Sequence, residues 1–450
     1  MGKGSGSGLT RGDRRRNARK AGLRALVPAV NAVAGLDLGE YRQAVAVVDH
    51  DGRVLARRSP AVGVHGLGGY LDWAAGQARA AGFAGLSVAC EPTGSRWMAV
   101  RELCRARGLP FVCVQPLVSH IAREQQDLTG DKTDEGDCVL AGRLAAQLHC
   151  YVPEELEGAW AELRAEGRHR AALITRATSA QLLVRDQLGL AAPALLAACA
   201  APFDSATWLA CLQVVAERRL AGPDAAAAVG WAGFAAAARA NLGSWGGRRL
   251  GATAAAVFAA LRDPAGVAPM RRAAFRRIAR ALEDLRHARS CRGRAEAEMI
   301  TLLGGLGIDC QRICQIPGLS PVLLAAILAE TGDLHKYESS SSVVKHAGMS
   351  PARNESGEFR GQAKISRRGR PALRLAAWRA AWAVLRHCDV LAAKHAALTS
   401  RAASPLADAQ ARVACAASLL RWIWSLTVHG TRWDPRIAAG ELSHHHATAA

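Results

Sequence analysis

No charge-free apolar run in this sequence is long enough to span a membrane, and no secretory h-region occurs. The closest stretch, AAAAVGWAGFAAAARA, is bracketed by Asp224 and Arg239 and is mostly alanine, which is barely apolar. The twelve cysteines have no framework spacing, and a chain of 450 residues does not require disulfides. We therefore expect a soluble protein of a reducing cytoplasm, without a membrane partner.

Acidic residues are also scarce, since 38 Asp and Glu face 58 Lys and Arg. The formal charge is +20 and the isoelectric point is near 10.2, with arginine supplying almost all of the excess. Such a field favours a polyanionic partner, because each neutralised phosphate releases counterions. Nucleic acid is the expected partner; a membrane surface is the rival, which the lack of an apolar spanning run and of an h-region disfavours.

Composition and periodicity divide the chain into five regions, and the length alone favours two or three folded domains. The first region consists of a Gly/Ser-rich segment followed by an arginine cluster. This composition predicts a disordered basic arm, which would either bind a nucleic-acid backbone or increase solubility. The predicted regions are a basic arm over 1–28, a catalytic domain over 29–150, a helical connector with an Ala-rich insertion over 151–305, a C-terminal domain over 306–436 and a disordered tail over 437–450.

Short apolar runs predict an α/β fold for the second region. VAGLDLG, QAVAVVDH and DGRVLARRS read as three strands, with Asp51-Gly52 as the hairpin turn between the last two. A helix over 68–81, the strand LSVACE, a helix over 95–107 and the strand FVCVQP follow. Three antiparallel strands followed by alternating helix and strand is the element order of the RNase H-like fold.

The remaining regions are predicted to be mostly helical. Phe275, Ile278, Leu282 and Leu285 step by three and four, which suits a helix lying along another helix, either as a coiled-coil dimer seam or as ordinary core. From Gly307 a Pro-Gly turn, an apolar helix and a serine-capped helix resemble a helix-hairpin-helix, which offers backbone amides to DNA phosphates.

Four acids stand where the predicted elements end or begin. Asp37 ends the first strand, Glu91 follows the fourth, and Asp134 and Asp137 lie one turn apart at a helix start. Converging carboxylates without a basic partner would repel one another, and divalent cations relieve that repulsion. A metal site for phosphoryl transfer is the resulting hypothesis, with Lys132 as a phosphate contact; the alternative is four unrelated surface acids.

Two other groups of residues suggest chemistry. Cys310 and Cys314 with His335 lack a second ligand pair, so buried thiols are favoured over zinc. Ser356, in PARNESGEFRG, is followed by Gly357 and could be a nucleophile or part of a polar surface loop. The cations near this serine that could hold phosphate are Arg353, Arg360, Lys364, Arg367, Arg368 and Arg370.

The motifs GLDLGE, CEPTG, KTDEGD, IPGLSPVLLAAILAETGD, HAGMSPARNESG and KISRRGRPALR occur in the order seen in the DEDD insertion-sequence transposases, which include the Piv and MooV invertases. The resemblance covers residues 32–150 and 308–436. It departs from the usual pattern at Glu40, where lysine is usual, and in KTDEGDC around Glu135. These departures affect expected nucleic-acid contacts and leave the four acids intact.

The resemblance implies a RuvC-like domain whose tetrad is Asp37, Glu91, Asp134 and Asp137, binding Mg²⁺ or Mn²⁺. It implies a coiled-coil connector and a C-terminal domain in which Ser356 forms a 5′-phosphoserine link to DNA. It further implies donor and target DNA, a structured guide (bridge) RNA, and a dimer or tetramer whose protomers share composite active sites. The expected location is the nucleoid of a prokaryotic cell.

Three other functions stay open at the level of sequence. A site-specific invertase of the same family would share every residue named above. A RuvC-like junction endonuclease would use water and would not need the serine. A non-catalytic nucleic-acid-binding descendant would show damage to the tetrad, and all four acids are present.

Overall fold

The computed structural model describes residues 8–126, 133–154, 158–220, 222–263, 272–352, 355–356, 359–360 and 364–441. The chain forms two compact units, residues 1–155 and 156–450. Among the described residues, no helix is both long and apolar enough to cross a membrane.

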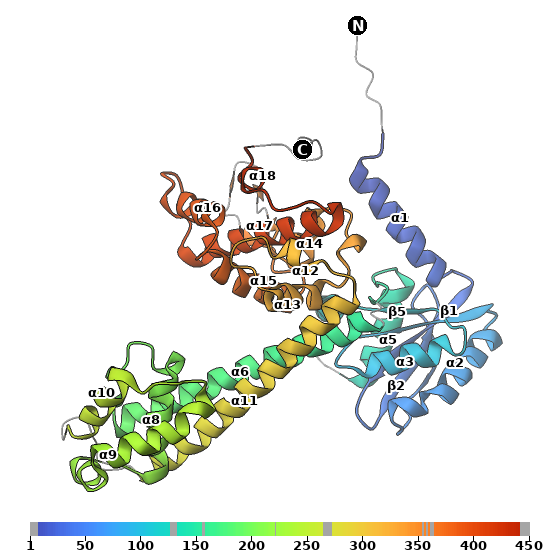
Figure 1. Cartoon of the computed structure of the whole chain (residues 1–450). Coiled ribbons are helices and arrows are strands. Elements are labelled where there is room, and N and C mark those ends of the chain that lie inside the picture. The colour runs from blue at the N-terminus through green and yellow to red at the C-terminus, as the bar shows by residue number, and fades with distance from the viewer. Residues whose placement is uncertain are drawn as a thin grey trace. The chain divides into compact units, whose positions relative to one another are not determined.

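The first unit is built on a five-stranded sheet with the order β3-β2-β1-β4-β5 (Figure 1). Neighbours β1, β2 and β3 are antiparallel, whereas β1, β4 and β5 are parallel. This mixed order is consistent with the RNase H-like fold that the sequence predicts. The strands are β1 Asn31–Leu38, β2 Gln43–Val48, β3 Val54–Arg58, β4 Gly85–Cys90 and β5 Phe111–Cys113.

Helices cover both faces of this sheet because β1 and β2 are buried on both sides. Leu36 and its neighbours pack against α2 and α3, whereas Val33 and its neighbours pack against α5, the C-terminal end of α1 and part of α4. The helices of this unit are α1 Arg11–Leu26, α2 Gly68–Ala80, α3 Arg96–Arg105, α4 Pro116–Gln126 and α5 Asp134–Ala146, with a 3₁₀ turn η1 over Val64–Leu67.

Residues 11–26 correct the prediction of a disordered arm, since the structure has the helix α1 there. The Thr10 side chain accepts from the Asp13 amide, and the Asp13 carboxylate accepts from the Thr10 amide, which satisfies two donors that the first turn leaves open. Leu23 and Val27 are buried in the core of the sheet domain and anchor the end of the helix.

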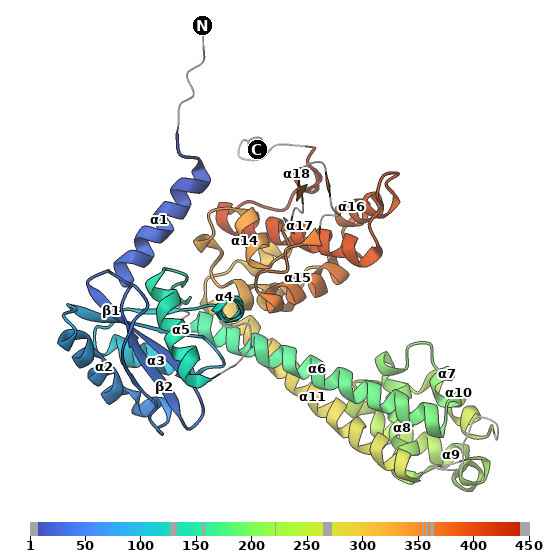
Figure 2. The same ribbon diagram turned by 180° about the vertical axis from the view of Figure 1, so that it is seen from behind.

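Within its described residues, the second unit is helical apart from four short strands. Helices α6 (Ala159–Ala191) and α11 (Arg272–Gly305) lie side by side (Figures 1 and 2). They are antiparallel, because Leu163 and Leu303 share one core while Leu188 and Phe275 share another. One core includes the smaller elements α7 Ala194–Ala197, η2 Pro202–Asp204, α8 Ala206–Arg218, α9 Pro223–Leu242, η3 Gly243–Trp245 and α10 Gly251–Leu261.

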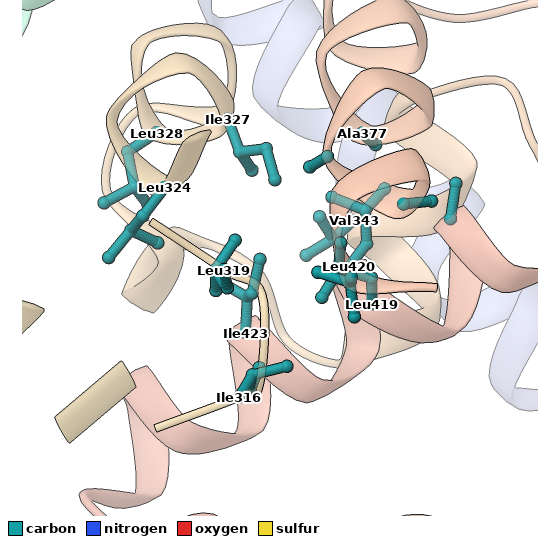
Figure 3. Packing of buried hydrophobic residues seen from close by; sticks show 14 of the residues in the cluster. Ile316, Leu319, Leu324, Ile327, Leu328, Val343, Ala377, Leu419, Leu420 and Ile423 are labelled. Atoms are coloured by element: carbon teal, nitrogen blue, oxygen red, sulfur yellow. The ribbon is translucent and has the colours of Figure 1, made fainter. Parts of the chain in front are cut away.

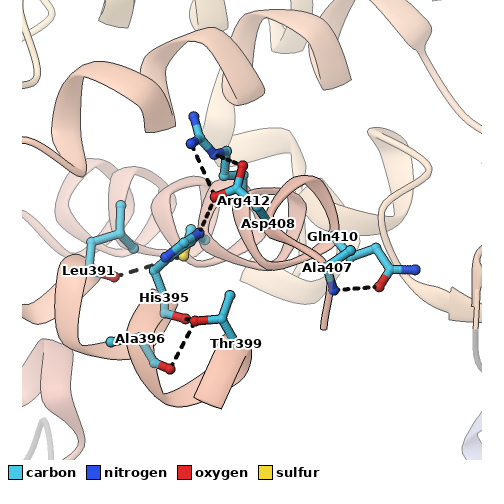
Figure 4. A network of polar contacts seen from close by, with 9 residues as sticks. Leu391, His395, Ala396, Thr399, Ala407, Asp408, Gln410 and Arg412 are labelled. Atoms are coloured by element: carbon cyan, nitrogen blue, oxygen red, sulfur yellow. Dashed lines mark hydrogen bonds and ion pairs between the residues drawn. The ribbon is translucent and has the colours of Figure 1, made fainter. Parts of the chain in front are cut away.

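The other core is formed mainly by helices that follow α11. Figure 3 shows Leu324 and Ile327 of one helix packed near Leu420 and Ile423 of another. Asp408 links two of these helices, since its carboxylate lies 3.2 Å from His395 Nε2 and accepts from Arg412 (Figure 4). The elements are α12 Cys310–Ile313, α13 Pro321–Thr331, η5 Leu334–Lys336, α14 Ser340–His346, α15 Pro371–Val384, α16 Asp389–Ser400, α17 Asp408–His429 and α18 Pro435–Ala439.

The segment after α14 contains two short antiparallel pairs. Strand β6 (Pro351–Ala352) pairs with β9 (Lys364–Ile365), and β7 (Glu355–Ser356) pairs with β8 (Phe359–Arg360). The surface loop considered as one alternative for this segment therefore contains paired strands. The predicted C-terminal tail includes the helix α18, and residues 442–450 lie outside the described part.

Candidate functional site

Two of the predicted acids lie at neighbouring strand ends in the first unit. The parallel register of β1 and β4 pairs Leu36 with Cys90. Asp37 directly follows Leu36, and Glu91 directly follows Cys90. Both carboxylates are half-buried and line one cavity of about 290 Å³. The structure thus places these two acids beside each other at one sheet edge.

The third acid reaches the same cavity because α5 packs unusually closely on β1. A Cβ atom at Gly35 would lie 2.0 Å from the Cys138 carbonyl oxygen, so only glycine allows this approach. Gly142 allows the same approach from the helix, because a Cβ atom there would lie 2.9 Å from Val48 Cγ2 and 3.4 Å from the Gly35 amide nitrogen. Asp137 directly precedes Cys138 and is thereby held at the cavity. On the facing strand β1, Asp37 lies two residues after Gly35 and lines the same cavity.

Asp134 differs from the prediction that all four acids converge. It is the first residue of α5, directly after the N-cap Thr133, whose hydroxyl accepts from the Gly136 amide. Asp134 is exposed and is not among the residues that line the cavity. Over the part of the chain that the structure describes, no three Asp, Glu, His or Cys side chains are grouped closely enough to hold a metal ion.

The sequence also missed a basic partner within the cavity. Arg123 of α4 donates from Nε and Nη2 to Asp137 Oδ1, at 3.0 and 2.6 Å. Both side chains are mostly buried, with exposures of 22% and 15%. A guanidinium therefore offsets part of the repulsion among the carboxylates. No sequence signal links these two residues, because α4 and α5 are brought together only by the fold.

Three further residues line the cavity beside the acids. Ser119 is buried and its hydroxyl lies 3.5 Å from the Gln115 carbonyl oxygen, while His120 is exposed and faces Glu124 at 3.4 Å. Thr93 follows the Glu91 turn. The cavity thus combines carboxylate and hydroxyl oxygens, which are the ligands that hard divalent cations prefer.

The two acids that depart from the family pattern both face arginine in the same unit. Glu40 lies 4.0 Å from Arg96, and Glu135 lies 3.4 Å from Arg57. These pairs are solvent-exposed and contribute little to stability.

The candidate serine belongs to the second unit, where its backbone pairs with Phe359 across β7 and β8. Lys132 and Arg353 lie outside the described residues, and Arg360 is placed only as part of β8. Lys364, Arg367 and Arg368 are exposed. The first two line a cavity of about 800 Å³ with Lys394 and Arg421, which sequence reasoning did not select.

Arg370 does not fit the predicted role of a phosphate contact. Its Nε donates to the carboxylate of Glu330, which is only 5% exposed, and its amide bonds to the His346 carbonyl. A buried carboxylate needs such a partner, so Arg370 has a structural task in this unit.

The zinc alternative receives no support. Burial raises the pKa of the Cys310 thiol and raises that of Cys314 to about 11. His335 bonds to Asp333 at 2.9 Å.

Comparison with known proteins finds matches to residues of both units, and the first match continues past the boundary at residue 155 into the second unit. Residues 34–193 match a model of DEDD transposases of the IS110 type, described as "Transposase", and residues 310–396 match a model described as "Transposase IS116/IS110/IS902 family". The chain is also 34% identical over 79 residues to the transposase for insertion sequence element IS1111A of Coxiella burnetii (strain RSA 493 / Nine Mile phase I). That match covers 18% of this chain and 22% of the relative, so the chain spans about a fifth of the curated relative's length.

The resemblance to the DEDD insertion-sequence transposases is thus confirmed by matches on both units. The chain belongs to the IS116/IS110/IS902 family of transposases and carries that family's DEDD domain at its N-terminal side.

Proposed function

We propose that the chain is the transposase of an insertion sequence, which cuts and rejoins DNA strands through a serine nucleophile. The observation that carries the proposal is the cavity in which Asp37 and Glu91, at adjacent parallel strand ends, lie with Asp137. This family and this arrangement of acids both favour phosphoryl transfer over the purely DNA-binding alternative.

The carboxylate oxygens that line this cavity are the donor type that a divalent cation prefers, and the acids must draw closer together to bind one. Asp37, Glu91 and Asp137 would hold Mg²⁺ or Mn²⁺, with Asp134 of the tetrad joining them from the start of α5. The bound ion would supply charge stabilisation to the attacking and leaving oxygens. Arg123 would have to give up its bond to Asp137 as the ion binds.

In the proposed reaction the Ser356 oxygen attacks the scissile phosphorus. The new bond joins this oxygen to phosphorus, the bond from phosphorus to the 3′ oxygen breaks, and the serine proton passes to the departing 3′ hydroxyl. The product is a 5′-phosphoserine, and attack by another 3′ hydroxyl reverses the chemistry and rejoins strands. No oxidant, reductant or water is consumed.

Basic residues around the serine segment are proposed to hold the DNA backbone. They are Lys364, Arg367 and Arg368, which are exposed, together with Lys132, Arg353 and Arg360. The helix-hairpin-helix-like element formed by α13 and α14 is proposed to add amide contacts from the serine-capped start of each helix, at Ser320 and Ser339.

The proposal includes an assembly of chains and a guide. The serine and the acids belong to different units, and the family resemblance favours a dimer or tetramer in which acids of one protomer serve the serine of another. The charge of +20 supports a second nucleic acid beyond DNA, a structured RNA encoded by the element.

Substitution of the serine tests the chemistry directly. Ser356→Ala is expected to abolish both recombination and the covalent protein-DNA adduct seen on denaturing gels, while DNA binding stays within a few-fold. An S356A chain that still cleaves DNA at the parent rate would contradict the serine mechanism and favour the RuvC-like endonuclease.

Substitution of a metal-binding acid provides the complementary test. Asp37→Ala is expected to abolish strand exchange and to leave nucleic-acid binding within a few-fold, because it removes a metal ligand and no phosphate contact. Loss of binding would count against the assignment. Sequencing the copurifying nucleic acid tests RNA guidance: a discrete structured RNA is expected, and its absence would favour the invertase.

A further inference from the structure

The helix α1 is a separate feature of the first unit and precedes the residues that match the family models, which begin at residue 34. It extends away from the sheet (Figure 2) and is exposed along nearly its whole length, with Leu23 buried near its end. Its single acid, Asp13, is engaged in the cap. A helix this polar is not held by its own packing, and Arg19 and Lys20 on it are exposed to solvent.

One face of α1 forms a wall of a cavity of about 780 Å³. Arg16, Arg19 and Lys20 are spaced by three and one, which places them on that face above the buried Leu23. Residues of α4, of the C-terminal half of α5 and of the segment up to Tyr151 complete the lining. We call this cavity the α1 groove.

The lining of the α1 groove is cationic at its rim. Arg143 adds a fourth permanent cation and is fixed by donating from Nε to the Gly52 carbonyl at 2.8 Å. Among the residues that the structure describes, no Asp or Glu lines the groove; Arg16 lies 3.8 Å from Asp13 outside it, whereas Arg19 and Lys20 have no ion pair with a described residue. Glutamines 115, 125 and 147 add neutral donors and acceptors. Guanidinium, ammonium and amide groups in a groove whose lining has no carboxylate suit a chain of phosphates and sugars.

Helix α4 separates this groove from the acid cavity. Val118, Ile121, Ala122 and Gln125 line the groove, whereas Ser119, His120 and Arg123 line the acid cavity. The two sets follow the i, i+3, i+4 spacing of opposite helix faces. A helix is about 10 Å across, so an anion in the groove lies within roughly a helix diameter of the carboxylates.

We propose that the α1 groove binds the sugar-phosphate backbone of the DNA whose neighbouring strand is presented to the acid cavity. This inference rests on the proposed function, because DNA is the proposed substrate of the adjacent acids. It assigns α1, which lies outside the family-matched residues, the role of a clamp that fixes the substrate relative to Asp37, Glu91 and Asp137.

The test measures binding of a fluorescein-labelled DNA duplex of about 30 base pairs, long enough to span several phosphate contacts. It uses the full chain with Asp37→Ala, so that no chemistry occurs. In that background Arg19→Gln with Lys20→Gln is expected to weaken binding about tenfold at low salt, and to reduce the slope of log K against log salt by about 1.8, or 0.9 per lost phosphate contact.

The matched control removes the same charge from the same helix. Arg14→Gln with Arg15→Gln alters two exposed arginines that do not line the groove, and is expected to change the affinity less than about threefold. Circular dichroism and the melting temperature should match the parent in both double variants, since all four side chains are exposed.

Three outcomes would overturn the proposal: no loss of DNA affinity in the groove variant, an equal loss in the control, or a loss confined to an RNA duplex of the same sequence. Because binding is measured without catalysis, its result is separate from the Ser356 adduct assay. A missing adduct with intact groove-dependent binding refutes the serine chemistry alone, whereas a normal adduct with groove-independent binding refutes the clamp alone.

Discussion

At the residue scale, Gly35 decides whether the acids can meet. The Cβ position of this glycine is occupied by backbone atoms of α5, namely the Cys138 carbonyl and the Gly142 amide. Backbone atoms cannot move aside as a flexible side chain can. The placement of the Asp37 and Asp137 carboxylates at one cavity therefore depends on Gly35, which has no functional side chain.

We predict that Gly35→Ala destabilises the first unit by about 3 kcal/mol, because α5 must move away from β1. Gly76→Ala is the control: nothing lies within 4 Å of its Cβ position in α2, so a helix-interior alanine should stabilise by about 0.5–1 kcal/mol. Urea unfolding followed by circular dichroism measures both. Equal stability of the two variants would contradict the close packing.

Arg123 is the second residue on which the acid cavity depends. It neutralises Asp137 when no ion is bound, and it competes with an ion for the same carboxylate oxygen. Breaking a largely buried pair leaves an uncompensated carboxylate, which costs stability. Removing the arginine also raises the negative potential that attracts a divalent cation.

Arg123→Met is accordingly expected to lower the melting temperature in EDTA and to bind Mn²⁺ several-fold more tightly, as measured by electron paramagnetic resonance of the free ion. The rise in melting temperature on adding Mn²⁺ should be larger than in the parent. Arg57→Met removes an exposed arginine bound to Glu135 outside the cavity and should leave both quantities nearly unchanged. Weaker Mn²⁺ binding in R123M would show that the arginine supports the ion.

At the element scale, the apolar stripe of α11 has a clear role within one chain. Phe275, Ile278, Leu282 and Leu285 are all at most 2% exposed and pack with α6 and α8. In the structure this stripe is ordinary core, the second of the two alternatives that its spacing left open.

Ile278→Ala should therefore cost about 2–5 kcal/mol of unfolding free energy, as expected for a large-to-small change in a packed core. The oligomeric state at fixed concentration, measured by light scattering, should not change. Arg280→Ala, on the exposed side of the same helix, should alter stability by less than about 0.5 kcal/mol. Dissociation of an assembly by I278A would instead point to a seam between chains.

The strands of the first unit could be predicted closely because each appears in the sequence as a short run of apolar residues. β4 and β5 begin within one residue of the predicted positions, and α2 ends one residue before its predicted end. The strands β6 to β9 were missed because two-residue strands leave no periodicity to read. The cap of α1, Thr10 with Asp13, is a readable signal that the arginine cluster obscured.

The candidate site was predictable only in part, for a physical reason. Asp37 and Glu91 could be placed because parallel strands end at one edge. Three other features depend on contacts between separate elements. They are the exposure of Asp134 outside the cavity, the bond from Arg123 to Asp137 and the bond from Arg370 to the buried Glu330. Local pattern holds no information about such contacts.

At the scale of the whole molecule, each unit has cores made from its own residues, and thiols are distributed through them. Burial raises the pKa of the thiols of Cys104, Cys138 and Cys211 from 9.0 to about 12. The first lies under the sheet, the second faces β1, and the third lies in the helical core of the second unit.

These raised values predict that the protein loses stability at alkaline pH. An unfolded thiol ionises near pH 9 and the buried thiol near 12, so each favours the folded state fully below pH 9 and loses this contribution as pH rises toward 12. By pH 10.5 the loss is on the order of 1–2 kcal/mol per thiol, because one pKa unit corresponds to about 1.4 kcal/mol. Arginine, which supplies most of the positive charge, stays protonated across this range.

Thermal unfolding under reducing conditions between pH 8 and 10.5 measures the effect. Cys211→Ala should melt below the parent at pH 8, because it leaves a small cavity, yet should lose less stability than the parent as the pH rises. Cys291→Ala is the control, since this thiol is only half-buried in α11 and its removal should leave the pH dependence unchanged. Parallel pH profiles for the parent and C211A would mean that thiol ionisation does not limit the fold, and would assign the alkaline loss to tyrosine and lysine instead.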